Sequence, residues 1–111
     1  MTPVTDSLLQ QMASAIVEAV QPERIILFGS HARGGARPDS DVDLLVVERE
    51  PFLGGRSRRR EIARIRGSLS RFRVAKDILA FAADEFEAYR DAKNHVVATS
   101  IEEGRVLYER S

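Results

Sequence analysis

Two short motifs in the first half of the chain combine residue types that could bind phosphate with residue types that could bind a divalent cation. The first is Gly29-Ser30-His31-Ala32-Arg33-Gly34, and five residues later comes the second, Ser40-Asp41-Val42-Asp43-Leu44. A glycine turn offers backbone N–H groups and a serine hydroxyl to an anion. Paired carboxylates offer the hard oxygens that Mg²⁺ prefers. Phosphoryl and nucleotidyl transfer need both, because that chemistry consists mostly of positioning and charge neutralisation.

Each motif adjoins a segment with the composition of a buried strand. After Arg24, residues 25–28 are all apolar and begin with two β-branched isoleucines, and residues 41–47 end in four apolar positions. Such runs are typical of buried strands. Residues two apart on a strand point to the same face, so Asp41 and Asp43 project together, about 6.5 to 7 Å apart along the chain. Val42 points the other way, into the core. The site requires the glycine turn to lie beside the start of the second strand.

A third carboxylate is available at Asp77, near the start of a third expected strand at residues 74–81. An acid that starts a strand is usually only solvated, but beside two other acids it can complete a metal site. Three carboxylates held together without a cation repel one another, which raises at least one pKa. We therefore expect Asp41→Asn or Asp43→Asn to abolish catalysis without destabilising the metal-free protein.

The motifs and their spacing resemble the signature of the minimal nucleotidyltransferases, a small branch of the DNA polymerase β-like nucleotidyltransferase superfamily. Ten residues separate the glycine–serine pair from the first aspartate, as in that superfamily, and residues 103–109 resemble its terminal strand. The resemblance implies that Asp77 helps to activate the acceptor hydroxyl. It implies that the catalytic residues, which also bind Mg²⁺ or Mn²⁺, are Asp41, Asp43 and Asp77. It implies that the nucleotide-binding residues are Gly29, Ser30, Arg33 and Ser40.

By the same resemblance the chain is an enzyme that moves AMP, or another nucleoside monophosphate, from ATP or another nucleoside triphosphate to a hydroxyl group. Stand-alone proteins of this kind are often encoded with a HEPN-domain ribonuclease toxin and act as its antitoxin by transferring AMP to a tyrosine of the toxin. A complex with such a partner is therefore expected. Two alternatives stay open: a non-catalytic antitoxin that neutralises its partner by binding, and a small-molecule nucleotidyltransferase completed by a partner subunit.

Length and composition predict one minimal nucleotidyltransferase domain over residues 1–111. The expected fold is α/β (α+β), a small mixed β-sheet flanked by helices, similar to the polymerase β-like palm. A chain that is 43% hydrophobic and 31% charged can bury a core. The lack of cysteine excludes disulfides and thiolate metal sites. We expect no membrane segment and a cytoplasmic location. The formal net charge of +0 argues against direct, indiscriminate nucleic-acid binding.

Residues 56–73 hold eight arginines and a single acid, Glu61. The segment has helical periodicity, with an apolar stripe at Ile62, Ile65, Leu69 and Phe72. The arginines expected mainly on the solvent side are Arg58, Arg59, Arg66 and Arg73. This helix is either a solvated face or a docking surface for an acidic partner or for RNA phosphates. Reversing Arg58 and Arg59 to Glu is expected to weaken partner binding with little change in stability.

The other expected helices frame these elements. Thr5 or Asp6 can cap a first helix that ends before Pro22. Further helices are expected from residue 83 and over residues 94–103, where Gly104 ends the last one. Neither histidine is expected to be a metal ligand.

Overall fold

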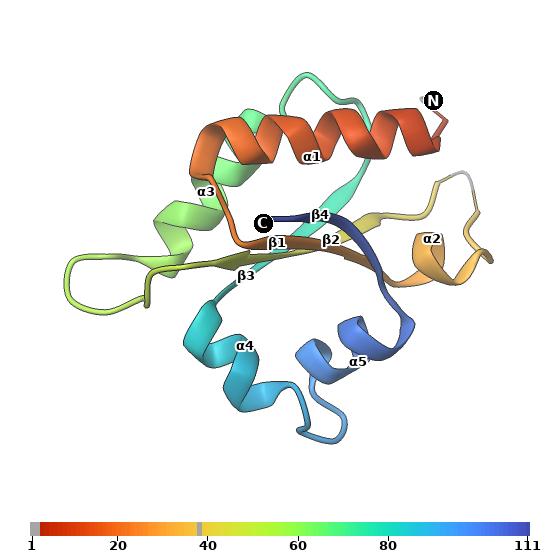
Figure 1. Cartoon of the computed structure of the whole chain (residues 1–111). Helices are drawn as coiled ribbons and strands as arrows, with labels where there is room; N and C mark the ends of the chain where they lie inside the picture. The colour runs from red at the N-terminus through yellow and green to blue at the C-terminus, as the bar shows by residue number, and fades with distance from the viewer. Residues whose placement is uncertain (1–2, 38) are drawn as a thin grey trace.

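A computed structural model describes residues 3–37 and 39–111, and Figure 1 shows how their elements are arranged. In chain order the elements are α1 (Asp6–Val20), β1 (Arg24–Phe28), α2 (Ser30–Arg33), β2 (Val42–Glu48), α3 (Arg58–Ser68), β3 (Lys76–Ala82), α4 (Ala83–Tyr89), α5 (Val96–Glu103) and β4 (Arg105–Glu109).

The four strands form one mixed sheet in the order β3-β2-β1-β4. Strand β1 is antiparallel to both β2 and β4, whereas β2 and β3 are parallel. A parallel pair needs a crossover connection, and α3 supplies it. Helices α1 and α3 cover one face of the sheet and α4 and α5 cover the other, while α2 lies at one end (Figure 1). This confirms the expected mixed sheet flanked by helices.

Strand β2 is buried on both faces, which explains its unbroken apolar run. Leu44 and Val46 belong to the core under α1 and α3, whereas Leu45 and Val47 belong to the core under α4 and α5. Odd-numbered residues of β2 therefore face α4 and α5, and this alternation decides where its aspartate points.

Helix α1 begins and ends where its sequence predicts. The Thr5 hydroxyl oxygen accepts a hydrogen bond from the backbone N–H of Leu8 at 3.1 Å. The helix ends at Gln21, whose φ of 49° is left-handed, directly before Pro22. Although α1 is the longest described helix, with 15 residues, no helix in the described ranges is long and apolar enough to cross a membrane.

Helix α3 is shorter than the arginine-rich segment predicts. Ser57 caps its first turn by accepting a hydrogen bond from the backbone N–H of Arg60 at 3.2 Å, so the helix starts at residue 58. The expected apolar stripe is buried at Ile65, Leu69 and Phe72 and half-buried at Ile62. The acid Glu61 is also buried, at 8% exposure.

The prediction that Arg58 faces solvent is wrong. Its guanidinium is half-buried and donates to both carboxylate oxygens of Glu85, at 2.8 and 2.5 Å. It also donates to the carbonyl oxygen of Ala80 at 2.8 Å. Arg58 therefore joins α3 to β3 and α4, and its reversal to Glu would place two carboxylates together. Arg59, in contrast, is exposed as expected.

Candidate functional site

The pairing of β2 with β3 brings two of the predicted carboxylates side by side. Asp43 and Asp77 are direct partners in the parallel register, and paired residues of neighbouring strands project from the same face of a sheet. By the alternation of β2, that is the face covered by α4 and α5. Asp41 lies two residues earlier, exposed, just before the strand begins.

The electrostatics of Asp43 reflect this neighbourhood. Burial raises the pKa of its carboxyl, and the negative charges of Asp77 and Asp41 raise it further. The positive charges of His31 and Arg33 act in the opposite direction but less strongly. Asp77 and Asp41 are thus each close enough to Asp43 to raise its pKa.

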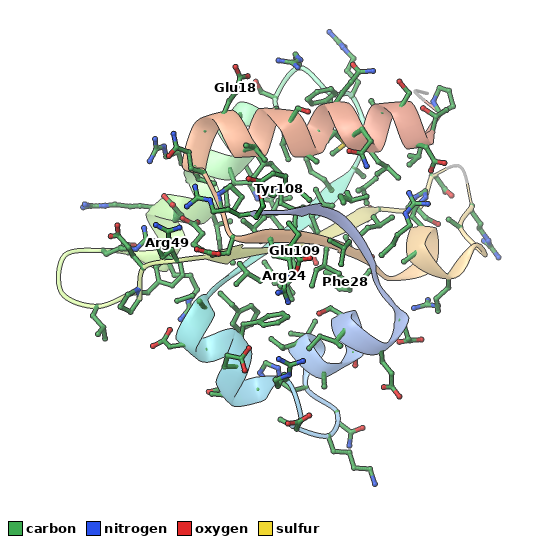
Figure 2. The ribbon with its side chains drawn as sticks, in the orientation of Figure 1. Glu18, Arg24, Phe28, Arg49, Tyr108 and Glu109 are labelled. Carbon is green, nitrogen blue, oxygen red and sulfur yellow. The ribbon has the colours of Figure 1, made fainter. Side chains whose placement is uncertain are left out.

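The glycine turn lies against this carboxylate. Phe28, the last residue of β1, is the register partner of Asp43, and its ring packs on the core at the α4–α5 side (Figure 2). Gly29 follows with a φ of 73°. A Cβ atom added there would lie 2.1 Å from Oδ2 of Asp43. Only glycine permits both this backbone conformation and this approach.

One contact at the site was missed by sequence reasoning, which gave His31 no role. Nε2 of His31, in α2, lies 2.9 Å from the carbonyl oxygen of Ser40. A carbonyl oxygen only accepts hydrogen bonds, so Nε2 carries a hydrogen and is the donor of this one. The Ser40 hydroxyl accepts from the backbone N–H of Arg37 at 3.0 Å. His31 thus ties the helix after the glycine turn to the residue before Asp41, across nine positions that no local pattern links.

Among the described residues, these carboxylates have no lysine or arginine as an ion-pair partner. In the described ranges, no lysine or arginine lies within 4.0 Å of a carboxylate oxygen of Asp41, Asp43 or Asp77. The same ranges hold no group of three or more His, Asp or Glu side chains already arranged to hold a metal ion. The site is therefore a row of exposed and half-exposed oxygen donors beside a glycine turn, chemically suited to a hard divalent cation.

Solved structures share this fold. A chain from a toxin–antitoxin crystal structure with AMP-PNP matches with a TM-score of 0.63 and 16% identity, over 97% of this chain and 76% of that one. A Sulfolobus solfataricus structure described as a nucleotidyltransferase matches with a TM-score of 0.59 and 19% identity, over 95% of this chain and 80% of that one. A chain from a complex of tri-AMPylated Shewanella oneidensis HEPN toxin with MNT antitoxin matches with a TM-score of 0.58 and 16% identity, over 96% of this chain and 74% of that one.

A comparison with curated proteins finds no match. The family model of the nucleotidyltransferase domain, in contrast, matches residues 9–108, from α1 to β4. That range contains the glycine turn, the aspartates of β2 and β3 and the whole sheet except its final residue. The chain therefore belongs to the nucleotidyltransferase domain family.

Proposed function

We propose that this chain is a magnesium-dependent nucleotidyltransferase that moves AMP from ATP to a hydroxyl group, with a tyrosine of a HEPN-domain toxin as acceptor, and so acts as an antitoxin. The observation that carries the proposal is the register pairing of Asp43 with Asp77, with the backbone of Gly29 against the Asp43 carboxylate. Two structures of similar fold support the partner: a toxin–antitoxin with AMP-PNP, and a tri-AMPylated HEPN toxin bound to MNT antitoxin.

The residues at the site fit a divalent cation. Their donors are carboxylate oxygens, which suit Mg²⁺. The charges of Asp41 and Asp77 raise the pKa of Asp43, and a bound cation would offset that repulsion. We therefore assign Asp41, Asp43 and Asp77 as the residues that would hold it. When bound, the cation would neutralise phosphate charge and lower the pKa of the acceptor hydroxyl.

The chain's own residues would then position and activate the reactants. Gly29 and Ser30 would hold the triphosphate, assisted by Arg33 and Ser40. Asp77 would accept the proton of the acceptor hydroxyl, whose oxygen forms a bond to the α-phosphorus. The bond between that phosphorus and the bridging oxygen to the β-phosphate breaks in line, and pyrophosphate leaves.

Incubation of the chain with Mg²⁺, ATP labelled at the α-phosphate and the HEPN toxin encoded beside it tests the proposal. We expect label on a toxin tyrosine, and none with Asp43→Asn. The matched control is Asp91→Asn, which removes an exposed aspartate outside the site. A stable complex without label would instead make the chain a binding antitoxin. Label only on added small alcohols would make it a small-molecule nucleotidyltransferase.

A further inference from the structure

Helix α3 and the turn after it present an outward face that carries only positive charge. Its exposed arginines are Arg59, Arg60, Arg64, Arg66, Arg71 and Arg73. The single acid of this stretch, Glu61, points inward and is buried, and Arg56 donates to it at 3.5 Å. We call the six exposed arginines the arginine face.

Ion pairing does not account for most of these charges, although the Arg71 guanidinium also lies over the Phe72 ring, 4.6 Å from its centroid. In the described ranges, five of the six have no carboxylate within 4.0 Å, and the sixth, Arg64, lies at that limit from Glu61. Arg59 and Arg60 also stand in the first turn of α3, where the helix dipole disfavours positive charge. By contrast, Arg56 and Arg58 form internal ion pairs, with Glu61 and Glu85 respectively.

The spacing of the arginine face leaves room for close approach. Residues 60, 64 and 67 form one row along the helix, residues 59, 63 and 66 form the next, and Arg71 lies in the turn after it. Ala63 and Gly67 lie between the arginines and are exposed, and a Cβ atom added at Gly67 would meet nothing within 4 Å. A rigid partner can therefore contact the helix surface at these two small residues, and guanidinium groups on both sides can then reach the partner. Their planar forks bind phosphate or carboxylate through paired hydrogen bonds.

The surroundings favour phosphate over a protein carboxylate. Protein interfaces combine arginine with exposed aromatic or apolar anchors that fill pockets on the partner, but the large apolar side chains Ile65, Leu69 and Phe72 of this segment are buried in the core and leave the arginines without such anchors. Contacts to a phosphate backbone need cations and shape only. Binding of a single strand would also need exposed aromatic rings for stacking, and the arginine face has none.

The neutral net charge of the chain does not oppose this, because exposed acids outnumber exposed cations on the other side of the sheet. On α4, α5 and the segment between them the exposed acids are Asp84, Glu87, Asp91, Glu102 and Glu103, against the exposed cations Arg90 and Lys93. A polyanion would therefore be attracted more strongly to α3 than to the α4–α5 side.

We infer that the arginine face docks the phosphate backbone of double-helical nucleic acid, without reading its sequence. The test is fluorescence anisotropy of a labelled 20-base-pair RNA duplex with the full chain over a series of salt concentrations. The affinity falls with salt, since each neutralised phosphate adds about 0.9 to the slope of log K against log salt. Replacing Arg60, Arg64, Arg66 and Arg71 by Gln weakens binding at least about tenfold and lowers that slope by about 4.

The matched control replaces four other arginines by Gln: Arg49, Arg90, Arg105 and Arg110. It removes the same charge outside the arginine face and leaves the affinity within about twofold. Equal losses in the two variants would overturn the inference, because bulk charge would then explain the binding. The inference would also be overturned if the unmodified chain did not bind the duplex at about 50 mM salt, where contacts to phosphate are strong. Tighter binding of a polyglutamate peptide would overturn it as well, and would assign the face to an acidic protein.

Discussion

The two ends of strand β2 carry acidic clusters whose charges are handled in opposite ways. At the start of the strand, Asp43 lies beside Asp77 with Asp41 nearby, and in the described ranges no lysine or arginine pairs with them. At the end of the strand, Glu48 faces the opposite side of the sheet, towards Glu61 of α3. Both glutamates are buried, at 4% and 8% exposure.

The glutamate pair is neutralised from within. Arg56 donates to Glu48 at 3.1 Å and to Glu61 at 3.5 Å. The second oxygen of Glu48, Oε2, is buried and has no hydrogen-bond donor among the described residues. Burial and the neighbouring Glu61 carboxyl raise the pKa of Glu48 to about 8. Glu48 therefore keeps its proton at neutral pH, and that proton can serve Oε2 in a hydrogen bond to Glu61.

We propose that this difference separates a structural cluster from a functional one. One guanidinium and one retained proton balance the two buried glutamates, so that end of β2 needs nothing from solution. The aspartates at the other end remain accessible and unbalanced, which costs the fold some stability and leaves a place for an external cation. Clustered acids alone do not indicate a metal site; the lack of an internal counter-charge does.

Asp43→Asn gives the largest expected effect. Transfer of AMP falls at least about 10³-fold, or about 4 kcal/mol in the barrier. The apo protein is as stable or more stable at pH 7, because the variant removes a carboxylate whose pKa is raised by folding. This gain disappears below about pH 4, where the carboxyl is protonated in both states. Urea unfolding of the parent and the variant at pH 7 and below about pH 4 measures this gain. A clear loss of apo stability in the variant would place Asp43 with the structural cluster.

Arg56→Ala tests the other end of β2. It removes the donor to both buried glutamates and leaves Glu61 only the exposed Arg64, at 4.0 Å, as a cation, so the free energy of unfolding falls by about 3–5 kcal/mol. Arg49→Ala is the control, because Arg49 is exposed and pairs with Glu23 at the surface, where solvent screens the pair and it contributes little to stability. Urea unfolding at pH 7 compares the two. Similar losses in both variants would show that the glutamates do not depend on Arg56.

Glu48→Gln changes the pH dependence of stability. The folded pKa of about 8 lies above the ordinary value of 4.5, so this group's contribution is fully present below about pH 4.5 and is lost as pH rises through 8. In the parent protein this loss is at most about 1.4 kcal/mol per pH unit. The variant lacks it and gains stability relative to the parent between pH 5 and 8, with no further gain above. Parallel stability curves from pH 5 to 9 would contradict the retained proton.

The elements that carry the aspartates could be predicted because their signals are local. The apolar runs indicate β1 and β2, and alternation places Asp43 opposite Val42. The register that joins Asp43 to Asp77 could not be derived from such patterns, since it pairs residues 34 positions apart and depends on how α3 crosses between the strands. The motif spacing and its resemblance to a family supplied that step.

Side-chain partners far along the chain could not be predicted. Helical periodicity places Arg58 off the apolar stripe, but its partner Glu85 belongs to another helix, 27 residues later. Likewise, nothing local in the sequence indicates that Glu48 and Glu61 are buried or that Arg56 donates to both of them. Long polar side chains choose partners through the tertiary fold, so their roles emerge only with it.

His31→Ala gives the smallest expected effect and tests how the aspartate end of β2 is held. The variant loses the hydrogen bond to the Ser40 carbonyl, which costs about 1 kcal/mol of stability and loosens the residue before Asp41. We expect kcat/KM for AMP transfer to fall about tenfold, and His31→Gln, whose amide can donate, to recover part of it.

His95→Ala is the control: it removes an acceptor for the Val97 N–H at the start of α5, so it lowers stability but leaves kinetics unchanged. If the two alanine variants lose stability alike and neither changes kcat/KM, His31 only supports the fold and the aspartates do not depend on it for their placement.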